Sequence, residues 1–105
     1  MPDPSITAFR DHWKRISRIK EIVCTHYGVE VSIINSRAKP EEVSNARQVG
    51  MWISHVLCGG MAHIIAKHFN RTKNSVRYTI RTMEGRLGVD KKLKEAVDAL
   101  TEKCR

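Results

Sequence analysis

Apolar residues recur along this chain at spacings of three and four, and this periodicity limits its fold more than any other feature. Ile16, Ile19, Ile22 and Val23 illustrate it, because residues at these spacings form one stripe along a helix. The alternation typical of a strand is confined to residues 29–33. The sequence therefore predicts an all-α protein of about six helices.

Glycine, proline and capping residues divide the chain into these helices. Gly28 is expected to end the first helix in the left-handed conformation, and residues 59–60, both glycine, to end the third. Ser32 is predicted to cap the second helix and Thr72 the fifth, which Gly88 should stop. The predicted helices span residues 5–26, 33–36, 41–57, 61–69, 72–87 and 90–103.

A chain of 105 residues can bury one core but not two. We therefore expect a single domain over residues 1–105, in which residues 1–13 form an N-terminal helical extension carrying the aromatic pair Phe9 and Trp13. The side chains predicted to face the core in the third, fifth and sixth helices are Val43, Ala46, Val49, Gly50, Ile53, Val56 and Leu57; Val76, Ile80, Met83 and Leu87; and Leu93, Val97 and Leu100.

Several classes of protein are disfavoured by the composition. No apolar run approaches the roughly 18 residues of a membrane span, and no signal-peptide pattern opens the chain, so a cytoplasmic, nucleoid-associated protein without a membrane partner is expected. The cysteines at 24, 58 and 104 are odd in number and widely spaced, which indicates reduced thiols.

Motifs for catalysis and metal binding are missing from the sequence. It contains neither a Gly-x-x-x-x-Gly-Lys phosphate loop nor a Gly-x-Ser-x-Gly elbow, so we expect no enzyme activity, no cofactor and no small-molecule substrate. A metal site is the weaker alternative, because Cys58, His63 and His68 are five residues apart and do not share a helix face. The pair His55-x-x-Cys58 has no second pair to complete a set of ligands.

The positive charge of the chain is concentrated in residues 58–87. This segment holds six of the 19 Lys and Arg residues against the single acid Glu84, and it supplies +5 of the formal net charge of +8. Such a local excess of positive charge is typical of a surface that binds nucleic acid. The six basic residues are Lys67, Arg71, Lys73, Arg77, Arg81 and Arg86.

The same segment has the pattern of a helix-turn-helix. A short apolar helix (61–69) and a turn at residues 70–71 precede a longer helix, as in proteins that place a second, recognition helix in the major groove of duplex DNA. Lys73, Arg77 and Arg81 are four residues apart and share a face of that helix. The residue types at its start suit hydrogen bonding to bases: Thr72, Lys73, Asn74 and Ser75, followed by Arg77 and Tyr78.

A short basic loop is the second candidate contact. Arg37 and Lys39 lie in the loop Arg37-Ala38-Lys39-Pro40, from which they could enter a minor groove or bind phosphates.

Residues 45–51 (NARQVGM) and 65–76 (IAKHFNRTKNSV) resemble the C-terminal DNA-binding domain of the bacterial replication initiator DnaA, and the similarity extends over about residues 14–105. The resemblance implies a Trp-repressor-like, all-α fold that recognises short duplex boxes at replication origins and some promoters. It places the family's minor-groove arginine at or near Lys39, with Arg37 close by, and its phosphate-contacting arginine at Arg47. Its major-groove contacts fall on Arg71, Thr72, Lys73, Asn74 and Ser75.

The chain departs from the family pattern where the family reads its target. The family's Asp-His-Thr-Thr is replaced by Thr72-Lys73-Asn74-Ser75, the preceding turn is one residue shorter, and no ATPase domain is present in the sequence. We expect a stand-alone reader of double-stranded DNA in replication initiation or its control. Two alternatives remain: a transcription regulator of prophage or plasmid type, and a protein-interaction module that docks a partner through the N-terminal helix with Phe9, Trp13 and Trp52.

Overall fold

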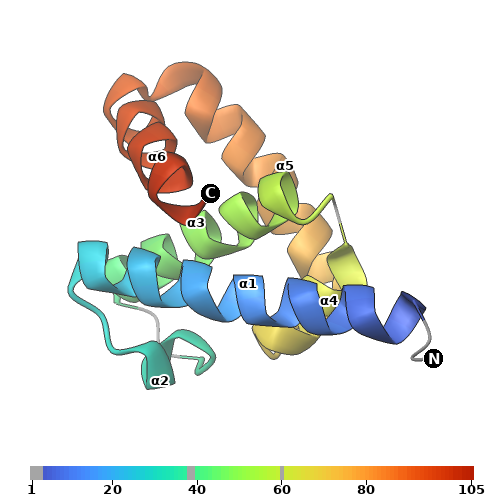
Figure 1. The fold of residues 1–105 in the computed structure, drawn as a ribbon. Helices are drawn as coiled ribbons and strands as arrows, with labels where there is room; N and C mark the ends of the chain where they lie inside the picture. The colour runs from blue at the N-terminus through green and yellow to red at the C-terminus, as the bar shows by residue number, and fades with distance from the viewer. Residues whose placement is uncertain (1–3, 38–39, 60) are drawn as a thin grey trace.

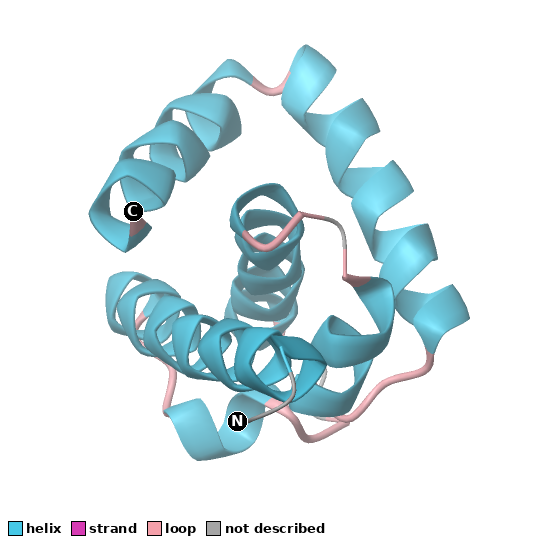
Figure 2. Cartoon of the chain, turned by 45° about the vertical axis from the view of Figure 1, so that its right-hand side comes forward, coloured by secondary structure: helices cyan, strands magenta, loops and turns pink. Residues whose placement is uncertain are grey.

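The computed structural model describes residues 4–37, 40–59 and 61–105, with side chains from Phe9 onward. Within that part of the chain every regular element is a helix (Figures 1 and 2). The elements are α1 (Pro4–Tyr27), α2 (Val31–Ile34), α3 (Glu41–Leu57), α4 (Ala62–His68), α5 (Lys73–Val89) and α6 (Lys91–Cys104). The predicted all-α fold of six helices is confirmed.

Helix α3 is the centre of the fold because it contacts each of the other five helices. Ala46, Val49 and Ile53 follow one another at three- and four-residue spacing and are fully buried. Helix α1 crosses the molecule beneath it, and α5 and α6 form the two arms of an inverted V (Figure 1). Asp90 lies between these two arms, as the C-cap residue of α5 and the N-cap residue of α6. Burial of apolar surface from all of these helices in one core is the main stabilising term.

Helix α5 is fixed in place by its apolar stripe. Val76, Ile80 and Met83 are buried and Leu87 is partly buried, as predicted. Because these residues recur every three or four positions, the helix buries one side against the core and leaves the opposite side exposed.

Three details of the helix assignment were wrong. Helix α2 begins at Val31 with Glu30 as its N-cap residue, so Ser32 lies inside the helix rather than capping it. Helix α5 continues through Gly88 to Val89, since Asp90 instead ends it and caps α6 by accepting a hydrogen bond from the amide of Leu93.

The third wrong detail concerns the buried side of α3. Val56 is 45% exposed, because the last turn buries Cys58 and partly buries Leu57 instead. Gly28 does adopt the left-handed conformation after α1, with φ of 67°, as expected of a C-cap glycine.

Candidate nucleic-acid interface

The start of α5 is defined by a side-chain cap. Thr72 has an extended backbone, and its Oγ1 accepts a hydrogen bond from the amide of Ser75 at 3.1 Å. Such a cap satisfies one of the amides that a helix leaves without a partner in its first turn. The predicted role of Thr72 as N-cap is confirmed, and it fixes where the side chains that follow are presented.

The polar side chains predicted to meet DNA lie on the exposed side of α5. Lys73, Asn74, Arg77 and Arg81 are all exposed, and Ser75 is half-buried. They come from the same helix whose apolar side is buried in the core, so the protein itself leaves this row accessible to a duplex. Tyr78 adds an aromatic ring to the exposed row, with 72% of the residue exposed.

The turn between α4 and α5 has an unusual backbone conformation. Asn70 has φ of 55°, in the left-handed region that asparagine tolerates better than most residues. The amide of Arg71 then donates to the carbonyl oxygen of Ala66 at 2.8 Å, which closes the end of α4. The turn predicted at residues 70–71 is therefore present, and it sets the angle at which α5 leaves α4.

The guanidinium group of Arg71 turns back onto the protein. Its Nη2 donates to the carbonyl oxygen of Ser36 at 2.7 Å, and its Nη1 donates to that of Asn35 at 3.2 Å. Nη1 also lies 3.5 Å from the carbonyl oxygen of Phe69 and 3.1 Å from that of Asn70. Arg71 thus bridges the helix-turn-helix and the segment that follows α2.

Arg47 reaches the same segment from α3. Its Nε donates to the carbonyl oxygen of Ile34 at 2.8 Å, and its Nη2 donates to that of Ser36, also at 2.8 Å. Burial, and then the neighbouring charge of Arg71, lower the pKa of Arg47 from its ordinary value. Two of the arginines predicted to contact DNA therefore converge on a single carbonyl oxygen of the protein.

Arg37 directly follows this segment and is exposed. Lys39, the other basic residue of the predicted loop contact, lies outside the described residues.

The two remaining basic residues of the positive segment 58–87 differ in exposure. Arg86 turns inward and donates through Nη1 to Oε1 of Gln48 at 2.7 Å. Lys67, by contrast, is exposed at the end of α4.

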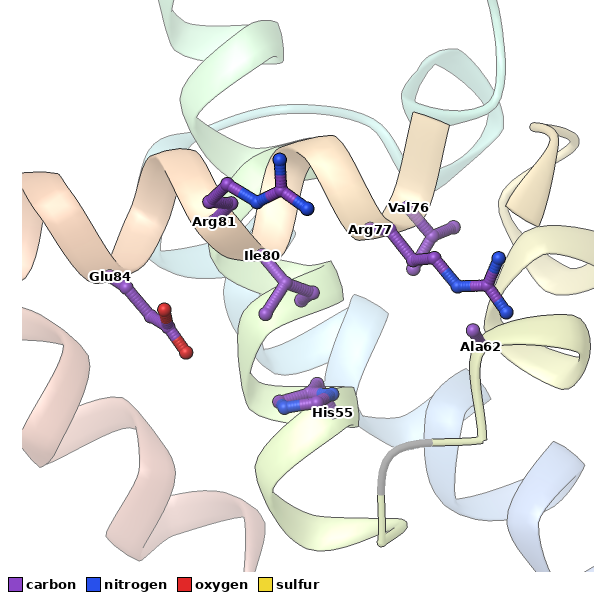
Figure 3. A pocket seen from close by; sticks show the side chains of 7 residues that line it. All are labelled: His55, Ala62, Val76, Arg77, Ile80, Arg81 and Glu84. Carbon is purple, nitrogen blue, oxygen red and sulfur yellow. The ribbon is translucent and has the colours of Figure 1, made fainter. Parts of the chain in front are cut away.

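An open groove of about 360 Å³ lies beside α5 (Figure 3). Its apolar lining includes Ala62, Val76 and Ile80, and the guanidinium group of Arg77 extends toward Ala62 at the start of α4. The groove lies between α4 and α5, with His55 of α3 also lining it. Along α5, Arg77 and Arg81 contribute positive charge and Glu84 contributes one negative charge. Its lining residues are His55, Ala62, Val76, Arg77, Ile80, Arg81 and Glu84.

A buried polar cluster was not predicted from the sequence. Lys20 is only 4% exposed, and its Nζ donates to Oδ1 of Asn35 at 2.8 Å and to the carbonyl oxygen of His68 at 2.9 Å. Burial lowers the pKa of Lys20 to about 8. The available signal was its position, since Lys20 is four residues after Ile16 and three before Val23 and so lies on the buried stripe of α1.

The aromatic pair of the N-terminal extension is stacked and part-exposed. The ring centroids of Phe9 and Trp13 are 5.6 Å apart, and the two residues are 38% and 36% exposed. The ring of Trp13 also lies 4.3 Å from that of His68, so it covers the buried polar cluster. Trp52, the third aromatic residue of the predicted docking surface, is partly buried against the core.

Three further observations concern metal ligands, cysteines and membrane-spanning helices. In residues 4–37, 40–59 and 61–105, no three His, Cys, Asp or Glu side chains are grouped as metal ligands. The three cysteines are buried free thiols, and burial raises the pKa of each. Helices long and apolar enough to cross a membrane are likewise missing from these ranges.

Comparison with known proteins finds similarity to one family. Residues 16–83 match the family described as "Bacterial dnaA protein helix-turn-helix". The chain is 32% identical over 89 residues to the chromosomal replication initiator protein DnaA of Mycoplasma capricolum, covering 84% of this chain and 20% of that protein. It is 29% identical over 86 residues to DnaA of Bacteroides thetaiotaomicron, covering 81% and 18%.

A solved structure agrees with these sequence matches. The crystal structure of a DNA replication initiation factor superposes with a TM-score of 0.81 at 26% sequence identity, covering 90% of this chain and 29% of that one. The chain therefore shares the fold of this factor, and it spans about a fifth of the length of the curated relatives it matches.

Proposed function

Because the chain belongs to the family of helix-turn-helix domains of bacterial DnaA, we propose that it binds double-stranded DNA in a sequence-specific manner and serves replication initiation or its control. The observation that carries the proposal is the arrangement of α5. Its apolar side is buried in the core, while Lys73, Asn74 and Arg77 are exposed at its capped start.

In the proposed complex the start of α5 enters the major groove. Lys73 can donate to the acceptor atoms of guanine, and Asn74 can pair with adenine through two hydrogen bonds. The half-buried hydroxyl of Ser75 and the exposed ring of Tyr78 extend the same surface. These side chains would carry the sequence preference.

Arg77 and Arg81 are assigned to the phosphate backbone. Both line the groove between α4 and α5, and a helix-turn-helix places its first helix across the backbone. No acidic residue occupies the first turn of α5, so the helix start does not repel a phosphate. These arginines would contribute affinity without sequence preference.

The basic loop is assigned to the neighbouring stretch of duplex. Arg37 is exposed beside the segment that Arg47 and Arg71 hold, and we propose that it contacts a phosphate or the minor groove together with Lys39. A minor-groove contact beside a major-groove helix is a known way to extend the recognised site.

Titration of labelled duplexes tests the proposal. A duplex selected from a random pool and a shuffled version of it are each titrated with the full chain at several salt concentrations. We expect log K to fall with log salt by about 0.9 for each phosphate contact, and the selected duplex to bind about 10³-fold or more tightly than the shuffled one at physiological salt.

One of the two alternatives, the protein-interaction module, predicts a different outcome of the same titration. A protein-interaction module would show weak binding with no preference for the selected duplex, and this result would reject the proposal. The exposed Lys92 on α6 offers a matched control, since Lys92→Ala removes one positive charge outside the proposed surface and should preserve the preference. A transcription regulator would bind DNA equally well, and the genomic position of the selected sites separates it from a replication protein.

A further inference from the structure

We propose that Arg71 is a positioning residue, which acts on DNA binding through Arg37 rather than by touching DNA itself. This inference rests on the proposed function. The guanidinium groups of Arg71 and Arg47 both hold the carbonyl oxygen of Ser36. They thereby determine where the next residue, Arg37, lies relative to α5.

The geometry shows that the guanidinium group of Arg71 is engaged by the protein. Its two terminal nitrogens donate to the carbonyl oxygens of Asn35 and Ser36, at 3.2 and 2.7 Å, and the residue itself is half-buried. These acceptors belong to the segment that leads directly into Arg37. The planar fork of arginine suits two adjacent carbonyl acceptors, and the compact ammonium group of lysine does not reproduce this arrangement.

The ends of two helices, α4 and α2, meet at this point, and each presents backbone carbonyl oxygens. Those of His68, Phe69 and Asn70 come from the end of α4, and those of residues 34–36 follow α2. The carbonyl oxygen of His68 is met in a buried contact, whereas the contacts to the carbonyl oxygens of Ser36 and Asn70 are exposed. The need for a protein donor is therefore strongest at the buried end of this cluster. The cationic donors are Lys20, Arg47 and Arg71, which come from α1, α3 and the turn before α5. The side-chain amide of Asn35 also donates to the carbonyl oxygen of His68, at 3.0 Å.

This contact affects the spacing between the two parts of the protein proposed to bind DNA, which are the start of α5 and Arg37 of the basic loop. Arg71 immediately precedes Thr72, the cap of α5, and it bonds to Ser36, which immediately precedes Arg37. Its side chain therefore connects the start of the recognition helix to the start of the basic loop. Loss of this connection should free the loop while α5 remains seated by its apolar stripe.

A direct phosphate contact by Arg71 is the competing explanation, and the two differ in what lysine can replace. A phosphate contact depends mainly on charge, so Arg71→Lys would retain most of the affinity. A positioning role depends on the fork, so Arg71→Lys and Arg71→Gln should weaken binding to the selected duplex to a similar extent.

The first test is a double-mutant cycle between Arg71 and Arg37, measured with the full chain and the selected duplex. We expect Arg71→Gln alone and Arg37→Ala alone each to weaken binding by about tenfold, and the double variant to be little weaker than either. Additive losses, with affinity restored by Arg71→Lys, would overturn the proposal.

The second test uses the free protein and does not depend on DNA. Trypsin can cleave after Arg37, and we expect Arg71→Lys to raise this cleavage rate by about tenfold while cleavage after Lys92 stays unchanged, because only the loop opens. An unchanged rate after Arg37 would overturn the positioning role. If the wild-type chain binds no duplex, the proposed function fails, yet the cleavage rate still decides whether Arg71 holds the loop. Arg71→Lys, the milder variant, serves both tests if Arg71→Gln does not fold.

Discussion

The ammonium group of Lys20 lies 3.2 Å from Nδ1 of His68, at the junction of α1 and the end of α4. The opposite ring nitrogen, Nε2, is 2.9 Å from Oγ of Ser17, which donates to the carbonyl oxygen of Trp13 at 3.2 Å. These contacts fit a neutral ring in which Nδ1 accepts from Lys20 and Nε2 donates to Ser17. The pair therefore carries one positive charge at neutral pH, since the pKa of Lys20 is about 8.

Acid should destabilise the protein through His68. Burial, and then the charge of Lys20, lower the pKa of His68 below its ordinary value of 6.5. As the pH falls through that ordinary value, the unfolded chain takes up a proton that the folded chain does not, so the free energy of unfolding decreases.

Urea unfolding at pH 7 and pH 5 measures this effect. We expect the wild type to lose more stability over that interval than His68→Gln, whose side chain cannot take up the proton. The exposed His63 at the other end of α4 gives the control, and His63→Gln should behave like the wild type. Equal acid sensitivity of the wild type and His68→Gln would contradict the assignment of a neutral buried ring.

Removing the cap of α5 should affect both stability and DNA binding. Thr72→Ala eliminates the hydrogen bond from the amide of Ser75. This loss should lower the free energy of unfolding by about 1 kcal/mol and fray the first turn of α5. Asp90→Ala removes the equivalent cap of α6 and should cost a similar amount. Unfolding and duplex titration together separate the two, because only Thr72→Ala should weaken DNA binding. Equal effects of both variants on affinity would argue against α5 as the recognition helix.

The left-handed turn between α4 and α5 should tolerate glycine but not a β-branched residue. Asn70 has φ of 55°, so Asn70→Val should lower the free energy of unfolding by roughly 1–2 kcal/mol, whereas Asn70→Gly should leave it nearly unchanged. Chemical denaturation of the two variants checks this prediction. Comparable stability of Asn70→Val and the wild type would show that the turn does not need this backbone conformation.

Two basic residues of α5 should have different effects on recognition. Lys73→Ala should reduce discrimination between the selected and shuffled duplexes by about 1–3 kcal/mol, because its proposed partner is a base. Arg81→Ala should weaken both duplexes to the same extent and lower the salt slope by about 0.9, because its proposed partner is a phosphate. Competition titrations measure both quantities. An unchanged ranking of duplexes by Lys73→Ala would remove it from the base-reading surface.

The sequence was sufficient to predict the helices and the exposed face of α5, because both follow from local rules. Apolar spacing located the buried sides of α1, α3 and α5, and Thr72 was recognisable as a cap from its type and position. The boundaries that were wrong depended on neighbours. Gly88 could have ended α5, but Asp90, two residues later, ends it and caps α6.

The contacts of Arg47, Arg71 and Lys20 could not be predicted, because they join segments that are distant in sequence. Arg71 lies in the positive segment 58–87, and the family resemblance placed a phosphate-contacting arginine at Arg47, so both were interpreted as DNA-bound. Only the fold shows that carbonyl oxygens from the end of α4 and from residues 34–36 lie within reach of these three side chains. Lys39 lies outside the described residues, so its predicted role remains a prediction.

The most direct measurement is amide chemical-shift mapping by NMR as the selected duplex is added to the full chain. The account predicts that the largest changes fall on residues 72–81 and on Arg37, while the amides of α6 around Lys92 change little. Changes confined to α6, or to the Phe9–Trp13 pair, with residues 72–81 unaffected, would contradict it.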